Sequence, residues 1–141
     1  MVYVDTSVLV ALLTNEATAG RIARWYEAET RPLISADWCV PEFASALALK
    51  ERTGQLTRKQ SNAAWKVFDE FCSAGLRLLP LDRDMFAQAA HLVRESKHGL
   101  RAGDSLHLAL ALSVHSEAFF TLDSRLEACA RQNKLSLVAL S

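Results

Sequence analysis

Five acidic residues stand at positions where a side chain could take part in catalysis. Asp5, Asp82 and Asp123 each end a short apolar run that is typical of a buried β-strand. Asp104 follows the turn GLRAG and opens an almost wholly apolar segment, and Glu42 lies in the first turn of a predicted helix. In a parallel sheet, functional residues gather beyond the carboxyl ends of the strands. We therefore expect acids to meet at that edge.

Each acid also has a structural interpretation. An Asp between a strand and a helix often caps the helix, because its carboxylate accepts backbone N–H groups. We favour that role for Asp82, since the helical stretch RDMFAQAAHLV follows at once. Capping explains Asp5 less well, because Thr6 and Ser7 beside it are alternative caps. Asp104 could cap the buried helix that it opens.

The other four acids form a group whose mutual repulsion requires a counter-charge. Two carboxylates about 5 Å apart repel by roughly 3 kcal/mol at an effective dielectric constant near 20. A hard divalent cation, Mg²⁺ or Mn²⁺, takes oxygen ligands and keeps several waters. Such an ion activates water and neutralises a phosphoryl group, which indicates phosphodiester hydrolysis. The sequence contains no GxSxG elbow, Walker loop or GxGxxG motif that favours another chemistry. The four acids are Asp5, Glu42, Asp104 and Asp123.

The predicted elements place these acids in an α/β fold. Short apolar strands alternate with longer helices, which is typical of a parallel sheet with helices on both faces. The predicted strands are 2–4, 33–35, 76–79, 118–121 and 136–138. The predicted helices are 7–14, 19–29, 41–52, 58–72, 84–97, 104–115 and 124–132. Ser124 to Glu127 is predicted to form a capping box for the last helix, which leaves Asp123 free for another role.

Composition sets the class of protein. The chain has 141 residues, of which 50% are hydrophobic and 23% are charged, as expected of one globular domain covering 1–141. Sixteen basic residues balance sixteen acidic ones, so nucleic acid must be bound through a local patch. No apolar run is long enough for a signal peptide or a membrane span. Three widely spaced cysteines without a CxxC pair predict reduced thiols and a cytoplasmic location.

Four segments carry a family resemblance. They are VYVDTSVLVALL, PEFASALALK with Glu42, LRAGDSLHLALAL with Asp104, and FFTLDSRLEACA with Asp123. In this order they resemble the PIN domain, specifically the toxin ribonucleases of VapBC toxin–antitoxin modules. The resemblance spans nearly the whole chain and implies an α/β/α sandwich and a Mg²⁺- or Mn²⁺-dependent endoribonuclease. By position it makes Asp5 and Asp104 the primary metal ligands, with Glu42 and Asp123 completing the acidic pocket.

Four further residues belong to the same motifs. The resemblance gives Ser7 the role of orienting the first carboxylate or a water, and Thr6 a weaker supporting role. Arg101 is a candidate contact for an RNA phosphate or a structural hydrogen-bond donor in its turn. We favour a packed, hydrogen-bonded core position for His107, since hydrolysis by metal-activated water needs no histidine.

The resemblance also implies partners. These are an RNA substrate, a cognate VapB-like antitoxin and a homodimeric partner, with a larger toxin–antitoxin assembly as a further option and no membrane contact. Arginine is the better phosphate-binding side chain, and solvated helix faces are the ordinary alternative. The candidate RNA-binding basic residues are Arg21, Arg24, Arg31, Arg52, Arg58 and Lys59.

Three other functions compete with this interpretation. A haloacid-dehalogenase-type phosphatase also has an Asp after its first strand, but it requires a second Asp where this chain has Ser7. A PIN-fold nuclease of RNA processing, outside a toxin pair, would carry the same acids. A non-catalytic PIN-like binding module would not require all four.

Overall fold

Four short parallel strands form the centre of the computed structural model, which describes residues 1–141. They lie in the order β3–β2–β1–β4, and Tyr3 of the central strand is in register with Ile34 and Phe119. The strands are β1 Val2–Val4, β2 Leu33–Ala36, β3 Arg77–Leu79 and β4 Ala118–Phe120. The predicted parallel sheet is confirmed.

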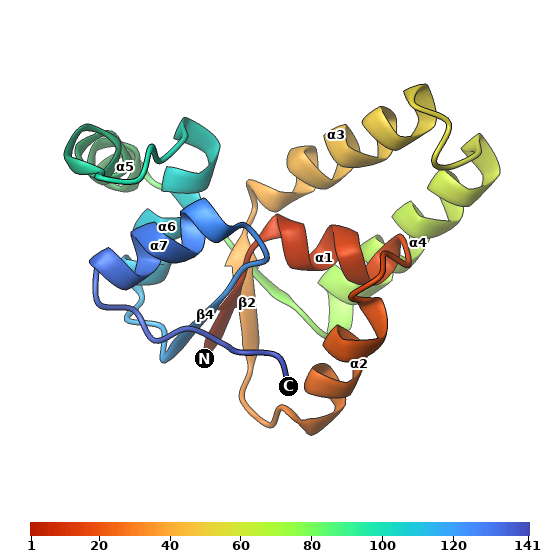
Figure 1. Cartoon of the computed structure of the whole chain (residues 1–141), viewed down its shortest axis with the longest axis horizontal. Coiled ribbons are helices and arrows are strands. Elements are labelled where there is room, and N and C mark those ends of the chain that lie inside the picture. The colour runs from red at the N-terminus through yellow and green to blue at the C-terminus, as the bar shows by residue number, and fades with distance from the viewer.

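Seven helices cover the sheet (Figure 1). They are α1 Thr6–Leu13, α2 Ala19–Ala28, α3 Cys39–Arg52, α4 Arg58–Ala74, α5 Arg83–Glu95, α6 Ala102–Ser113 and α7 Ser124–Gln132. Helices α3 and α4 form a hairpin that extends away from the sheet as an arm (Figure 1). The predicted helices all exist, with ends shifted by a few residues. Helix α6 begins at Ala102, so Asp104 lies in its first turn and does not cap it.

Two hydrophobic cores lie on opposite faces of the sheet. The strand side chains alternate, so Val2 and Val4 enter one core and Tyr3 enters the other. The first core also contains buried residues of α1 to α4, such as Phe43 and Phe68. The second contains residues of α5 to α7. This arrangement confirms the predicted α/β/α sandwich.

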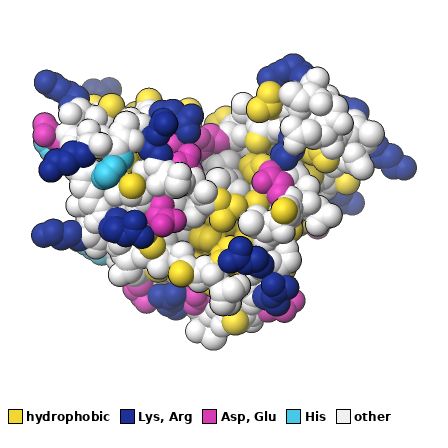
Figure 2. Space-filling view, in the orientation of Figure 1, with side chains coloured by type: hydrophobic (Ala, Val, Ile, Leu, Met, Phe, Trp, Pro, Cys, Tyr) yellow, Lys and Arg dark blue, Asp and Glu magenta, His cyan; other side chains and the backbone are white.

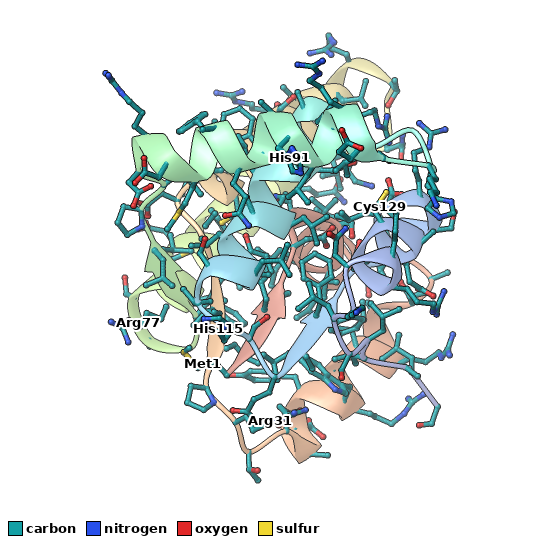
Figure 3. The ribbon with its side chains drawn as sticks, turned by 90° about the vertical axis from the view of Figure 1, so that its left-hand side faces the viewer. Met1, Arg31, Arg77, His91, His115 and Cys129 are labelled. Carbon is teal, nitrogen blue, oxygen red and sulfur yellow. The ribbon has the colours of Figure 1, made fainter.

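The strand order fixes where a site can form. The chain runs outward from β1 in both directions, toward β2 and β3 on one side and to β4 on the other. The carboxyl ends of β1 and β4 therefore flank the point at which the order reverses, which is where open α/β sheets bind ligands. Met1, Arg31 and His115 lie near one another at the other side of the sheet, by the amino ends of the strands (Figure 3).

The predicted fifth strand at 136–138 is absent. This segment makes only an isolated parallel bridge between Phe119 and Leu137. Its apolar residues are half-buried and pack against the two cores from the edge, where one partner strand is available. The three cysteines are free, as predicted.

Candidate active site

One cavity at the carboxyl edge of the sheet brings the predicted acids together. It has a volume of about 360 Å³. Figure 2 shows acidic side chains gathered where the surface is hollowed between the α3–α4 arm and the α5–α7 side. The four predicted acids line it with Thr6 and Ser7, whereas Asp82 caps α5 elsewhere. The lining residues are Asp5, Thr6, Ser7, Val10, Glu16, Glu42, Asp104, His107, Leu122 and Asp123.

Asp5 is almost fully buried at the end of β1, with 3% of its surface exposed. Asp5 itself caps α1, although the neighbouring alternatives Thr6 and Ser7 made this role the less favoured one in the sequence: it has the extended cap conformation and accepts the N–H of Val8. Its Oδ1 also accepts the Ser7 hydroxyl at 2.6 Å, and its Oδ2 accepts the Thr121 hydroxyl at 2.7 Å. Burial raises the pKa of Asp5, although these hydrogen bonds oppose the shift. Asp5 is thus rigidly held by both oxygens.

Glu42 reaches the cavity from the first turn of α3. Its Oε1 accepts the Thr6 hydroxyl at 2.6 Å and contacts Nε2 of His107 at 2.5 Å, while Oε2 has no hydrogen bond. Burial acts to raise the pKa of Glu42. The hydrogen bond and the charge of His107 outweigh that effect, so the pKa of Glu42 lies below its ordinary value. Glu42 is therefore an ionised carboxylate with one oxygen left for a ligand.

His107 is packed and hydrogen-bonded, as predicted, with 1% of its surface exposed. Its Nδ1 contacts the Tyr3 hydroxyl at 2.7 Å. Its Nε2 faces Glu42 and lies 3.2 Å from Oγ1 of Thr6. The contact with Glu42 could not be found from the sequence, because the two residues are 65 positions apart on different helices.

Asp104 is the least compensated carboxylate of the site. It accepts no hydrogen bond, and its one ion pair is a distant contact of 3.7 Å with Nε of Arg101. Burial raises the pKa of Asp104, and the negative charges of Asp123 and Asp5 raise it further. Both effects disfavour the ionised form, so this carboxylate gains most from a cation.

Asp123 caps α7 and also faces the cavity. The prediction that Ser124 supplies the cap is wrong, because Ser124 is already helical and Asp123 accepts the N–H groups of Arg125 and Leu126 through Oδ1. Its Oδ2 accepts a hydrogen bond from Nη2 of Arg101 at 3.2 Å. The cap therefore occupies one oxygen of Asp123 and leaves the other facing the site.

Arg101 supplies the cationic group next to the acids. It pairs with both Asp123 and Asp104, so the structural alternative considered for this residue is present. Its side chain is 66% exposed, and its contact with a phosphate stays a prediction. Several of the other candidate basic residues already have partners within the chain. These pairs are Arg31 with Glu29, Arg58 with Glu51, and Arg21 with the carbonyl groups of Leu140 and Ser141.

Two polar residues of the site were missed by the sequence analysis. Thr121 follows β4 and donates to Asp5, so hydroxyl groups that follow β1 and β4 both donate to one carboxylate. The segment TLD offered the signal, since Thr121 ends the run that leads to Asp123. Glu16 lies at the rim of the cavity and pairs with Lys50 at 2.9 Å.

Gly103 lies close against Glu42. A Cβ atom at Gly103 would stand 3.3 Å from Glu42 Oε2 and 3.4 Å from Trp38 Nε1. The buried indole N–H of Trp38 makes no hydrogen bond of normal geometry, yet it helps to lower the pKa of Glu42. Any larger residue at position 103 must push Glu42 or the indole aside.

The donor set fits a hard divalent cation. All four acids offer oxygen, and Mg²⁺ is usually held by one or two carboxylates together with waters. No three carboxylate, imidazole or thiolate groups already stand in a metal-binding arrangement. The cavity is wide enough for ligand waters, and the uncompensated charge of Asp104 together with the free Oε2 of Glu42 suits such an ion.

The sequence profile of the PIN domain matches residues 2–132. The chain belongs to the PIN-domain family. Within this family it is of the VapC type: it is 33% identical over 114 residues to each of two proteins from Mycobacterium tuberculosis, ribonuclease VapC45 and ribonuclease VapC49. The match covers 81% of this PIN domain protein and 76% of each relative.

Solved structures show the same PIN fold. The toxin VapC20 of Mycobacterium tuberculosis, described as cleaving the sarcin–ricin loop, superimposes with a TM-score of 0.71 over 91% of this chain and 94% of its own. FitAcB from Neisseria gonorrhoeae gives a TM-score of 0.63 over 99% and 97%. Both are 20% identical to this PIN-domain chain. None of its helices has the length and apolar composition that crossing a bilayer requires.

Proposed function

We propose that this VapC-type protein is a Mg²⁺- or Mn²⁺-dependent endoribonuclease and the toxin of a toxin–antitoxin pair. The observation that carries the proposal is the convergence of four carboxylates, from β1, α3, α6 and the end of β4, on one cavity. The two ribonuclease relatives support the substrate class. Such acids at a strand-order reversal suit a reaction on phosphate, which is negatively charged and needs a cation between itself and the carboxylates.

Asp5 and Asp104 would hold the cation, with Glu42 and Asp123 contributing directly or through water. When bound, the ion lowers the pKa of an attacking water and neutralises charge on the scissile phosphate. Asp5 is suited to fixed ligation because Ser7 and Thr121 hold its two oxygens in place. Oδ1 of Asp5 already accepts two donors, whereas Oδ2 accepts only the Thr121 hydroxyl and so retains a lone pair for a cation.

We expect RNA to contact Arg101, whose side chain is 66% exposed. Its guanidinium pairs with two acids at the mouth of the site. When a cation neutralises those acids, Arg101 loses its competing partners and can donate to an RNA phosphate. Ser7, with Thr6 in a lesser role, orients the carboxylates around the reacting water.

The proposal extends to partners and setting. We infer a homodimer in the cytoplasm, formed by a single domain covering 1–141, that a VapB-like antitoxin keeps inactive, with a larger toxin–antitoxin assembly as a further form. A small antitoxin-like reading frame beside the gene would support the toxin assignment, and its absence would favour a PIN nuclease of RNA processing.

The direct test is RNA cleavage by purified protein in Mg²⁺, in Mn²⁺ and in EDTA. We expect metal-dependent cleavage that EDTA abolishes, and an Asp104→Asn variant that folds but does not cleave. The same circular dichroism spectrum in both proteins shows that the fold is retained. Cleavage by Asp104→Asn at the wild-type rate would refute this mechanism, and the absence of cleavage by wild type in any metal would favour a binding module.

A further inference from the structure

Glu42 is held in the cavity through one oxygen. Oε1 takes both hydrogen bonds of normal geometry, from Thr6 at 2.6 Å and from Nε2 of His107 at 2.5 Å, whereas Oε2 accepts none and lies on the side of Gly103 and the Trp38 indole. A carboxylate fixed in this way cannot exchange its two oxygens by rotation without breaking both contacts. The same oxygen, Oε2, is therefore the one left for a ligand.

His107 is fixed in turn from its other side. Tyr3 has no exposed surface, and its hydroxyl lies 2.7 Å from Nδ1 of His107. The Tyr3 ring stacks on Phe119 at a centroid distance of 5.3 Å and meets the imidazole edge-on at 5.7 Å. Packing in the sheet thereby sets the orientation of the imidazole.

The hydrogen-bonding partners of His107 indicate which of its ring nitrogens carries a hydrogen. Tyr3 can donate its hydroxyl proton to Nδ1 of a neutral His107, which then carries its own hydrogen on Nε2. In the protonated imidazole Nε2 also carries a hydrogen. Because the ionised carboxylate of Glu42 can only accept, the contact favours these two forms, and in both of them Nε2–H points at Glu42.

We propose that His107 is a positioning residue, oriented by Tyr3, that fixes Glu42 so that Oε2 is presented to the metal or its ligand water. The proposal rests on the proposed function of the acidic site. A purely structural role explains why a histidine is buried. It does not explain why one ring nitrogen contacts Tyr3 in the sheet core while the other contacts Glu42 in the cavity. The hydrogen-bonding partners of metal ligands typically contribute 10- to 100-fold to metal affinity or activity.

Three variants separate positioning from stability. His107→Leu removes both contacts, His107→Gln keeps a side-chain N–H that can reach Glu42, and Tyr3→Phe removes only the hydroxyl. We expect Mn²⁺ affinity, measured by isothermal titration calorimetry, to fall about 10- to 100-fold in His107→Leu and to recover partly in His107→Gln. Tyr3→Phe should lower it by about 2- to 10-fold, since one hydrogen bond is lost while the ring packing is kept.

Activity supplies a second measurement. At saturating Mn²⁺ and RNA, kcat should fall in the same order while KM for RNA stays at the wild-type value, because the side chains of Tyr3 and His107 are buried. His91→Gln and Tyr26→Phe are matched controls, since His91 is exposed on α5 and Tyr26 is partly exposed on α2. Both controls should match wild type in Mn²⁺ affinity and in kcat.

Two results would overturn the proposal. One is wild-type Mn²⁺ affinity in both Tyr3→Phe and His107→Leu, with only the melting temperature lowered. The other is equal loss in His107→Leu and His107→Gln in proteins of equal stability. If His107→Leu does not fold, Tyr3→Phe decides the question alone. If wild type binds Mn²⁺ but does not cleave RNA, the proposed function fails, and the Mn²⁺ affinities still decide the role of His107.

Discussion

Asp5 and Asp82 form the same local motif in two regions of the molecule. Each follows a strand and caps a helix, with φ −85° and ψ 173° at Asp5 and φ −88° and ψ 174° at Asp82. Each accepts the backbone N–H three residues further on. Asp82 is exposed beside the edge strand β3, whereas Asp5 is buried at the end of the central strand β1.

Asp5 and Asp82 have different surroundings because their strands occupy different places in the sheet: β1 is central and β3 is at the edge. The side chain of Asp82 accepts only the Met85 N–H and does not line the cavity. Asp5 lies beside β4, so Thr121 and Asp123 arrive next to it, and α6 adds Asp104. A helix cap is thus specified by local sequence, whereas a site forms where the strand order brings several caps and acids together.

The largest expected effect is on RNA cleavage, in a comparison of Asp5→Asn with Asp82→Asn. Asn caps helices about as well as Asp, so both variants should fold. Asp5→Asn removes a carboxylate from the cavity and should reduce RNA cleavage at least about 100-fold, whereas Asp82→Asn should cleave at the wild-type rate. Initial rates on one RNA substrate measure both. An equal loss of cleavage rate in the two variants would mean that Asp5 does no more for catalysis than the helix cap Asp82.

A methyl group at Gly103 should have a smaller effect on the same region. Gly103→Ala places a Cβ 3.3 Å from Glu42 Oε2, so the carboxylate must shift by a few tenths of an ångström. We expect kcat and Mn²⁺ affinity to fall several-fold. Gly20→Ala is the control, because a Cβ there meets only the flexible end of Arg24 at 3.7 Å. That variant should keep full activity and gain about 0.5–1 kcal/mol of stability. Wild-type activity in Gly103→Ala would show that Glu42 tolerates displacement.

The cap role of Asp82 should appear in stability alone. Asp82→Ala removes the acceptor for the Met85 N–H and should cost about 0.5–2 kcal/mol in the free energy of unfolding. Urea unfolding measures this cost, and RNA cleavage by the folded protein should be unchanged. Reduced cleavage by Asp82→Ala at a temperature where it is fully folded would mean that the edge region also serves the site.

The pH dependence of stability at the acidic site should give the smallest effect. The pKa of Asp104 is raised in the folded protein, chiefly by burial and then by the neighbouring acids. Its protonated form is therefore favoured by folding. The stability linked to this proton is fully present below the ordinary Asp pKa and is lost as pH rises through the raised value.

Asp104→Asn removes the ionisable group and therefore the loss of stability that the folded protein undergoes when Asp104 ionises. In EDTA, the variant should be more stable than wild type at pH 7, and the difference should shrink as the pH falls through the raised pKa of Asp104 toward the ordinary Asp value. Urea unfolding at several pH values checks this expectation. A difference that is the same at every pH would mean that the charge of Asp104 is already compensated in the metal-free protein.

Much of this architecture was predictable from local sequence. Alternating apolar runs predicted four of the strands, and each predicted helix is present. The segments VYVD and FFTLD placed Asp5 and Asp123 at strand ends, because strand length and the following helix are visible in a few consecutive residues. The fifth predicted strand failed because its residues at 136–138 resemble a strand locally but find one partner, Phe119, in space.

The interior of the site was less predictable. Which residue caps α7 depends on where the helix begins, and Asp123 precedes Ser124 by one residue only. The contact of His107 with Glu42 and that of Thr121 with Asp5 join segments far apart in the chain. Such pairs depend on helix orientation above the sheet, which one sequence does not specify.

A thermal melt of wild type, Asp5→Asn and Asp82→Asn, each in EDTA, Mg²⁺ and Mn²⁺, is the most direct test for a cation site at Asp5. A ligand that binds only the folded state raises the melting temperature according to its concentration and affinity. The account predicts a metal-dependent rise in wild type and Asp82→Asn and none in Asp5→Asn. An equal rise in all three proteins, or no rise in wild type at millimolar metal, would contradict the claim that the acids around Asp5 form a cation site.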